Sequence, residues 1–196
     1  EPVRLGKTLS TPPDFAEGVI NSVGSAAKSM GLGVAELLAK TQLFFHGSTV
    51  VDNTILTLTG AKTGLVTTLG FEDTLLVTRG AYGRWGGLTE DEIKHPVATD
   101  RGPPLVPFDL IQGVPERVDW KGAVVHKIDE KAVEKAVRHL IEKKGVEAIA
   151  VTFLWSFLNP AHERKVRQIV KRVSPETYVS LSSDIAPIPG EYERTS

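Results

Sequence analysis

The stretch VEAIAVTF (residues 146–153) is a nearly continuous run of apolar residues, and the segments around it determine the expected fold. Such a run is typical of a parallel-sheet strand that is covered on both faces. A helix pattern begins at Asp129 and ends just before the run. After the run, Asn159-Pro160 begins another helix, and a short strand is expected over Tyr178–Leu181. The order strand, helix, strand predicts an α/β fold.

Both of these helices have one apolar face at helical spacing. In the first helix the face contains Ala132, Val133, Ala136, Val137, Leu140 and Ile141. In the second it contains Val166, Ile169, Val170 and Val173. These faces are expected to pack on the sheet.

A similar unit is expected nearer the amino terminus. Leu43–His46 has the pattern of a short buried strand, and Thr63–Thr68 is a strand rich in β-branched residues. Between them lies a helix whose shared face contains Val50, Val51, Ile55 and Leu58. Such a unit favours a parallel pair with a right-handed crossover. A hairpin-like segment is expected over Val118–Ile128.

Two helices are expected before this unit. Thr11 is placed as the cap of the first helix, with Pro12 at its first position and Asp14 at capping-box spacing. Its apolar face contains Phe15, Val19, Val23, Ala27 and Met30, and glycines at positions 31 and 33 end it. A short helix over residues 34–41 follows.

The composition indicates a folded protein with little net charge. The 196 residues include 23 Lys and Arg and 24 Asp and Glu, and 41% are hydrophobic. The balance gives no electrostatic reason to expect nucleic acid or a membrane surface as a partner. No run approaches the ~20 apolar residues of a membrane helix, and the start lacks a signal-peptide pattern. The sequence has no cysteine, which excludes disulfides and fits a cytoplasmic location.

The histidines show no metal-ligand spacing, and no Ser-His-Asp set can be assembled. They are His46, His95, His126, His139 and His162. No metal site and no catalytic residue is therefore predicted. His139 and His162 lie on expected helices and are expected to face solvent.

The first candidate site is His46-Gly47-Ser48-Thr49, with Asn53 one helical turn further on. At a strand-to-helix junction, the free N–H groups of the helix attract phosphate or carboxylate. Gly47 permits close approach, and the two hydroxyls add donors. The alternative is an ordinary helix cap, because Thr49 begins a capping-box spacing. The residues alone favour the cap, and the Lys of a Walker loop is missing.

The second candidate is the Gly- and Pro-rich stretch Arg79–Pro107, which is long enough to indicate a functional loop or an interface. Its segment RGAYGRWGG (residues 79–87) places Arg79, Tyr82 and Trp85 among glycines. These side chains suit the clamping of an anionic or aromatic ligand. They equally suit a protein–protein contact, which is the favoured interpretation.

Two further segments lie near the carboxyl terminus. SLSSD (residues 180–184) follows the last expected strand, at the edge of an open α/β sheet where ligands gather. Ser182 and Ser183 are therefore ligand candidates, although a plain polar turn fits equally well. EYERTS (residues 191–196) follows two prolines and is expected to be a charged linker.

Taken together and in this order, the segments resemble the N-terminal region of the hydantoinase A/5-oxoprolinase family. The similar segments are FHGSTVVDN (45–53), GAKTGLVTTLGFED (60–73), SFLNPAHE (156–163), SLSS (180–183) and EYERT (191–195). Ser48 stands where the family has the first Thr of its HGTT motif, which preserves the hydroxyl. The Arg79–Pro107 stretch looks more like the acetophenone and acetone carboxylase branch than like hydantoinases proper.

The resemblance implies one α/β domain over residues 1–196 with an insertion at 79–107. This domain would be a ribonuclease-H-like lobe of an actin-like, sugar-kinase-like ATPase. The family's first phosphate hairpin is expected just before Lys7–Pro12 and its second lobe after Ser196, and the chain contains neither. The lobe is therefore expected to be incomplete and inactive alone. The complete protein is expected to bind ATP and Mg, a small carbonyl substrate and bicarbonate, as one subunit of a hetero-oligomer.

Three functions follow from the resemblance. The leading one is a subunit of an ATP-dependent ketone carboxylase, a ligase in which ATP activates the carbonyl compound for carbon–carbon bond formation with bicarbonate. The second is an ATP-dependent hydantoinase or 5-oxoprolinase that opens a cyclic amide. The third is a non-catalytic assembly module of such a complex. The expected ligand-binding residues are His46, Gly47, Ser48, Thr49, Asn53, Arg79, Ser182 and Ser183.

Overall fold

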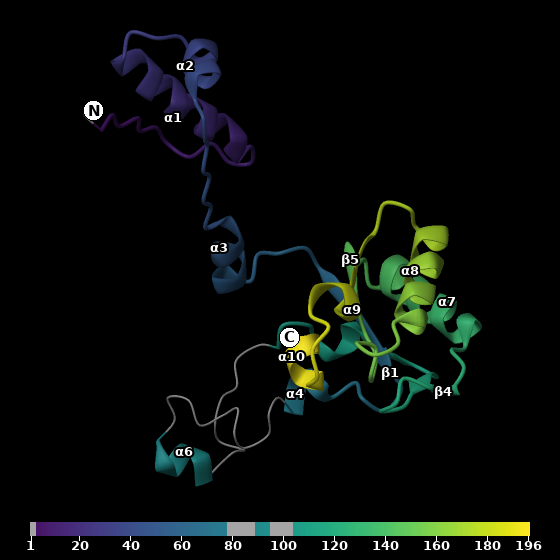
Figure 1. The fold of residues 1–196 in the computed structure, drawn as a ribbon. Coiled ribbons are helices and arrows are strands. Elements are labelled where there is room, and N and C mark those ends of the chain that lie inside the picture. The colour runs from purple at the N-terminus through teal and green to yellow at the C-terminus, as the bar shows by residue number, and fades with distance from the viewer. Residues whose placement is uncertain (1–2, 78–88, 95–103) are drawn as a thin grey trace. The chain divides into compact units, whose positions relative to one another are not determined.

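The computed structural model describes residues 3–77, 89–94 and 104–196. The chain forms two compact units, residues 1–51 and 52–196. In the first unit, α1 (Phe15–Ser29) and α2 (Val34–Lys40) contact each other (Figure 1). Both helices agree with the expectation from sequence. The boundary between the units falls inside α3 (Val50–Thr57), in which no residue is buried.

The start of α1 differs from the expected one. Asp14 is the cap, and its Oδ1 accepts a hydrogen bond from the Ala16 N–H at 3.0 Å. Thr11, the expected cap, instead accepts from the Gly18 N–H at 2.8 Å. The reason is local, because a proline disfavours helical backbone at the residue before it, and Pro12 precedes Pro13.

The second unit is built on a four-stranded parallel sheet of order β2-β1-β5-β6 (Figure 1). Its strands are β1 (Thr63–Thr68), β2 (Ile111–Val114), β5 (Ala148–Thr152) and β6 (Tyr178–Leu181). In β1, Leu65 is aligned with Ile111 on one side and with Ala150 on the other. The predicted α/β class with a parallel sheet is confirmed.

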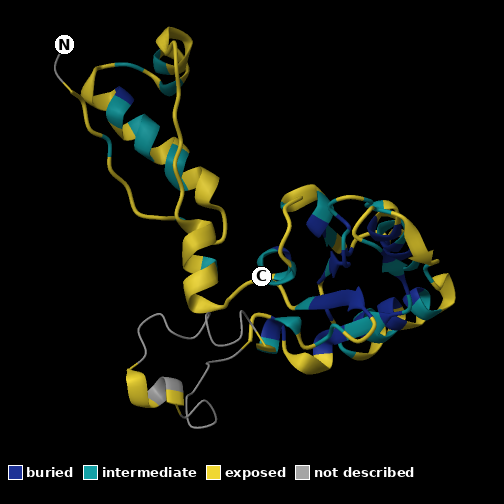
Figure 2. Ribbon diagram, turned by 60° about the horizontal axis from the view of Figure 1, so that its bottom comes forward, coloured by how far each residue is buried: buried dark blue, intermediate teal, exposed yellow. Residues whose placement is uncertain are grey.

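Two helices pack together beside this sheet. They are α7 (Glu130–Arg138), which continues into the π-helical turn η2 (His139–Lys143), and α8 (Ala161–Val173). Their expected apolar faces supply core residues that are all buried, namely Val133, Val137, Leu140, Val166, Ile169 and Val170. Leu65 and Val66 are adjacent in β1, so they point to opposite faces of the sheet. Both are buried, so both faces are covered (Figure 2).

Short elements complete this unit. They are α4 (Thr74–Val77), α6 (Glu90–Lys94), η1 (Phe108–Leu110), β3 (Arg117–Val118), β4 (Val124–His126), α9 (Ser182–Ile185) and α10 (Glu191–Thr195). The strands β3 and β4 pair antiparallel, which confirms the expected hairpin. Gly122 turns the chain between them with a φ of +79°.

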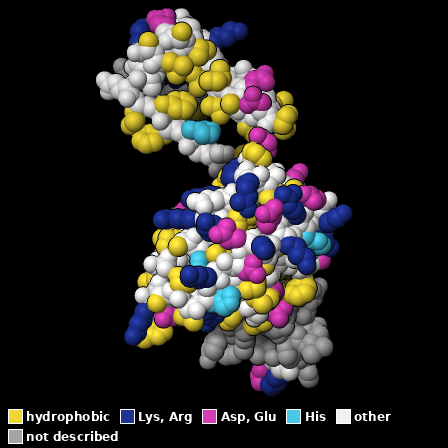
Figure 3. Space-filling model, turned by 90° about the vertical axis from the view of Figure 1, so that its right-hand side faces the viewer, with side chains coloured by type: hydrophobic (Ala, Val, Ile, Leu, Met, Phe, Trp, Pro, Cys, Tyr) yellow, Lys and Arg dark blue, Asp and Glu magenta, His cyan; other side chains and the backbone are white. Residues whose placement is uncertain are grey.

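No strand forms over Leu43–His46, so the expectation of a strand–helix–strand unit over residues 43–68 is wrong. The exposed fractions of Leu43, Phe44 and Phe45 are 68%, 53% and 85%. A strand needs neighbouring backbone for its N–H and C=O groups, and no described strand pairs with this segment. Hydrophobic side chains also gather on the surface of the amino-terminal part in Figure 3. Within the described ranges, no helix is both long and apolar enough to cross a membrane.

Asp129→Ala should lower the free energy of unfolding by about 1 kcal/mol, the usual cost of a lost helix cap. Asp129 Oδ1 accepts from the N–H groups of Lys131 and Ala132, each at 3.0 Å, and so fixes the start of α7. Urea unfolding followed by circular dichroism measures the change. Glu130→Ala is the control, since this neighbouring exposed carboxylate should contribute less than about 0.5 kcal/mol. Equal losses in the two variants would contradict the role of the cap.

Candidate functional site

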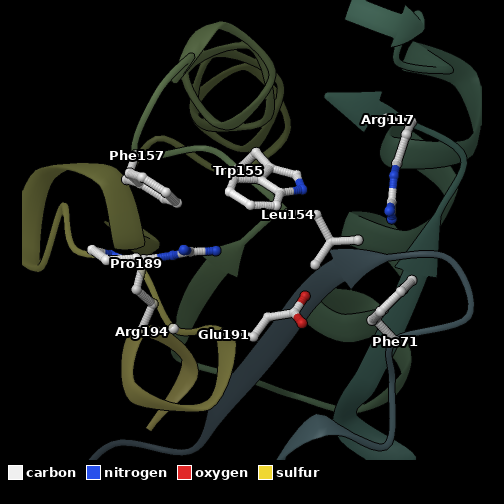
Figure 4. A pocket seen from close by; sticks show the side chains of 9 residues that line it. Phe71, Arg117, Leu154, Trp155, Phe157, Pro189, Glu191 and Arg194 are labelled. Atoms are coloured by element: carbon white, nitrogen blue, oxygen red, sulfur yellow. The ribbon is translucent and has the colours of Figure 1, made fainter. Parts of the chain in front are cut away.

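A cavity of ≈ 340 Å³ lies at the carboxyl edge of the parallel sheet. Its lining residues follow the carboxyl ends of all four strands, and they are Phe71, Arg117, Leu154, Trp155, Phe157, Pro189, Gly190, Glu191 and Arg194 (Figure 4). Parallel strands bring their carboxyl ends to the same edge, which is where open α/β sheets bind ligands. The position of the cavity makes it the candidate functional site of this unit.

One wall comes from the segment directly after β5. Trp155 has a φ of +58°, a left-handed conformation that is uncommon for a large side chain. The N–H of Ser156 donates to the carbonyl of Phe153 at 3.3 Å, and that of Leu158 to the carbonyl of Trp155 at 2.9 Å. The turn brings the rings of Trp155 and Phe157 to the cavity with their centroids 5.7 Å apart. Unusual backbone of this kind is often found at functional sites.

The opposite wall comes from α10, where a charged linker was expected. This expectation is wrong because the side chain of Arg194 is only 8% exposed and is hydrogen-bonded to backbone carbonyls. Its guanidinium donates to the carbonyls of Phe153 at 2.9 Å and Ile188 at 3.2 Å. It also lies 5.1 Å from the ring centroid of Phe157. Arg194, which would be exposed to solvent in a linker, therefore lines the cavity.

A second guanidinium lies across the cavity. Arg117, in β3, stacks over Phe71 with 5.3 Å between its central carbon and the ring centroid. Each arginine thus covers an aromatic ring, an arrangement that favours the cation. The cavity combines flat apolar surfaces with two positive charges.

The acidic group of the cavity is Glu191. Burial raises the pKa of its carboxyl, while Arg194 and Arg117 act in the opposite direction. Burial also lowers the pKa of Arg194, against the attraction of Glu163 and Glu191. An arginine stays charged at neutral pH even after such a shift. Within the described part of the chain, Oε1 of Glu191 and Nε of Arg194 are buried without a hydrogen-bond partner.

Behind the cavity, the buried carboxylate of Glu163 joins the ends of β5 and β6. Its Oε1 accepts from the Phe153 N–H at 3.0 Å and from the Ser182 hydroxyl at 2.6 Å. Its Oε2 accepts from the Ser183 N–H at 2.9 Å. Ser182 also lies 3.2 Å, oxygen to oxygen, from the buried hydroxyl of Ser156. The Ser182 hydroxyl is therefore engaged with Glu163, whereas the buried Ser183 Oγ has no hydrogen-bond partner among the described residues, and ligand binding by either serine stays a prediction.

A second buried polar cluster joins β1 to α8. Thr68 Oγ1 donates to Glu116 Oε1 and accepts from the Leu154 N–H at 3.2 Å. The other oxygen of Glu116 lies 2.8 Å from Nδ1 of His162. His162 is only 7% exposed, so the expectation that it faces solvent is wrong. The first turn of α8 is buried against the segment that carries Glu116, and helical spacing alone does not predict this contact.

Four residues of these clusters were not predicted from the sequence as site residues, namely Glu116, Glu163, Arg117 and Arg194. The burial of Glu163 could have been predicted from helical spacing. It precedes Val166 and Val170 by three and seven residues and therefore lies on the same face of α8. The others depend on contacts between distant segments. Among described residues, no group of three or more His, Asp or Glu side chains is arranged to hold a metal ion.

The remaining predicted site residues lie away from this cavity in sequence. His46, Gly47, Ser48 and Thr49 form no regular structure and are exposed. Ser48 Oγ accepts a hydrogen bond from the N–H of Val50, the first residue of α3, at 3.2 Å, and the alternative interpretation, a helix cap formed by Thr49, stays a prediction. Asn53 is exposed in α3. Arg79 and most of the stretch 79–107 lie outside the described residues.

Comparison with known families agrees with the motifs. Residues 1–174 match the model of the hydantoinase/oxoprolinase N-terminal region. The chain belongs to the hydantoinase/oxoprolinase family. The resemblance predicted from the sequence is thereby confirmed.

Members of the family with known structure or activity resemble the whole chain. It is 38% identical to the acetophenone carboxylase gamma subunit of Aromatoleum aromaticum, over 97% of this chain and 26% of that subunit. A nucleotide-free structure of acetone carboxylase matches with a TM-score of 0.85 and 33% identity, over 97% of this chain and 27% of that one. The ATP-dependent caprolactamase of Pseudomonas jessenii matches with a TM-score of 0.74 and 31% identity, over 95% and 26%. The chain thus spans about a quarter of the length of these relatives, and the carboxylases fit the predicted branch.

Glu163→Gln should lower the free energy of unfolding by about 2 kcal/mol, as expected when a buried charged acceptor is lost. The amide group of glutamine would direct hydrogens at donors, because both oxygens of Glu163 accept hydrogen bonds. Urea unfolding measures the effect. The matched control is Glu176→Gln, the same change at an exposed position, which should leave stability unchanged. A stability of Glu163→Gln equal to that of the control would contradict the bridging role of the carboxylate.

Glu191→Gln should stabilise the protein near neutral pH and have no such effect in acid. The raised pKa of Glu191 means that the folded state favours its protonated form. Its contribution to stability is therefore fully present below the unfolded pKa of about 4.3 and is lost as the pH rises through the higher folded pKa. Glutamine, being neutral, avoids that loss. Urea midpoints at pH 4 and pH 7 test the prediction, and a stabilisation of the same size at both pH values would refute it.

Proposed function

We propose that the chain is part of a subunit of an ATP-dependent ketone carboxylase, in which ATP activates a carbonyl compound for carbon–carbon bond formation with bicarbonate. The match to nucleotide-free acetone carboxylase, with a TM-score of 0.85 over 97% of the chain, carries the proposal. In this proposal, residues 1–196 form one domain with an insertion at 79–107. The parallel sheet belongs to a ribonuclease-H-like lobe of an actin-like ATPase.

The proposed phosphate contacts are His46, Gly47, Ser48 and Thr49. All four are exposed and directly precede α3, whose first N–H groups favour an anion. The bond from Val50 uses Ser48 Oγ as an acceptor, which leaves the Ser48 hydroxyl hydrogen for a ligand. These residues therefore fit a phosphate group. Bound ATP would supply the phosphoryl group that activates the carbonyl compound.

The other proposed ligand contacts are Asn53, Arg79, Ser182 and Ser183. Magnesium would be held mainly by the phosphates of the nucleotide, as is usual for this ion. The described residues supply no group of three or more His, Asp or Glu side chains that could hold it by themselves.

Two other functions have specific support. The similarity to an ATP-dependent caprolactamase supports the opening of a cyclic amide. The relatives include proteins that are named as subunits, which supports a role in assembly. For that role, the stretch Arg79–Pro107 is the proposed contact with partner subunits.

Substrate assays on the full-length protein and its partner subunits separate these functions. Carboxylase activity requires ATP consumption that depends on both bicarbonate and a ketone such as acetophenone. Consumption that depends on a hydantoin or lactam, without bicarbonate, would replace the first proposal by ring opening. No ATP consumption with either substrate class would leave the assembly role.

The double variant Ser48→Ala, Thr49→Val should slow the ATP-coupled reaction by about 1–4 kcal/mol of barrier, as expected for one or two lost charge-assisted hydrogen bonds. Steady-state kinetics of the assembled protein measures the loss. Ser29→Ala, which removes an exposed hydroxyl of α1, is the control and should keep full activity. Circular dichroism checks that the variants are folded. Unchanged kinetics in the folded double variant would reject these phosphate contacts.

A further inference from the structure

The cavity at the carboxyl edge has no role in the phosphate contacts proposed above. With ≈ 340 Å³ it is at the small end of ligand pockets, which range over about 300–1,000 Å³. Part of its wall is flat and apolar, from Phe71, Trp155 and Phe157. Such walls suit a compact ligand with an apolar, planar body.

The charges around the cavity favour an anion. Arg117 and Arg194 both line it, and among the described residues only the guanidinium of Arg194 donates hydrogen bonds, both of them to neutral carbonyls. Glu191 is the one carboxyl among the lining residues, and burial favours its neutral form. The balance of the cavity is therefore positive.

Polar groups without partners lie at the same place. Arg194 is only 8% exposed, and its Nε has no hydrogen-bond partner among the described residues. Figure 4 shows the indole nitrogen of Trp155 on the side of its ring that faces Arg117. An indole N–H donates only, and a guanidinium donates only, so both need an acceptor.

We propose that this cavity binds a small organic carboxylate with a planar apolar body, whose carboxylate accepts hydrogen bonds from Arg117 and Trp155. The guanidinium fork matches the two oxygens of a carboxylate. The body of the ligand lies against the aromatic walls, and Arg194 adds positive charge from the opposite side. The proposal does not rest on the carboxylase function, because binding can be measured without turnover.

Isothermal titration calorimetry of the full-length protein tests the proposal, with phenylacetate as the probe. Phenylacetate should bind saturably at one site per chain. Phenylacetamide has nearly the same shape without the charge and should bind at least tenfold more weakly. Absence of saturable binding, or equal affinity for the two compounds, would overturn the proposal.

Three variants locate the binding. Arg117→Gln should weaken phenylacetate at least tenfold and abolish its preference over phenylacetamide. Lys121→Gln removes a cation of the same hairpin whose ammonium lies over Trp120, 4.8 Å from the ring centroid, and it should bind like the unaltered protein. Trp155→Phe keeps a ring but removes the N–H, so it should weaken binding several-fold.

Melting curves confirm that each variant is folded. If Arg117→Gln does not fold, Trp155→Phe and the phenylacetamide comparison still decide the question. Equal weakening by Lys121→Gln and Arg117→Gln would place the ligand outside the cavity and refute the proposal. So would unchanged affinity in both Arg117→Gln and Trp155→Phe.

Discussion

The carboxylate of Glu163 is the interaction on which the carboxyl edge of the sheet depends. A buried carboxylate is costly unless donors surround it, and here two backbone N–H groups and one hydroxyl do so. The donors belong to the segments that leave β5 and β6. By holding both segments, Glu163 fixes the point where the chain turns toward the cavity. The positions of Trp155 and Phe157 follow from this constraint.

The cavity itself is held by arginines in two different ways. Arg194 is tied to backbone carbonyls, so its orientation is set by the chain around it. Arg117 rests on an aromatic ring, which supports the cation without neutralising its charge. The guanidinium of Arg194 is thus hydrogen-bonded to the chain, while that of Arg117 donates no hydrogen bond among the described residues. The cavity therefore has one arginine whose orientation is fixed and one whose donors are available to the carboxylate proposed above.

Much of the sheet could be predicted from sequence, and the reason is local. Residues 146–153 and 63–68 carry continuous apolar or β-branched patterns, and the flanking helices show clear stripes, so each element is specified by its own residues. The segment 43–46 carried a similar pattern but formed no strand, because pairing depends on a neighbour and not on the segment itself. Local pattern thus predicts an element well only when the fold also provides its partner.

The site was far less accessible to prediction. Glu116 meets His162 across 46 residues, and Arg194 meets Phe153 across 41. No spacing rule connects such positions, and charged residues near turns or termini usually lie in water. The short motifs that carried the family resemblance identified the family but not the cavity. The cavity is made by residues from four separate strand ends, which only the folded chain brings together.

The strand order has a consequence for synthesis on the ribosome. The central strand β1 is made before both of the strands with which it pairs, β2 and β5. The N–H of Lys62, directly before β1, donates a hydrogen bond to Glu147, which lies 85 residues later in the chain. At roughly 5–20 residues per second, the nascent β1 waits about 4–17 seconds for this partner. During that interval Leu65 and Val66 lack part of the core that buries them in the folded chain. Until β5 emerges, these apolar side chains are therefore exposed in the nascent chain.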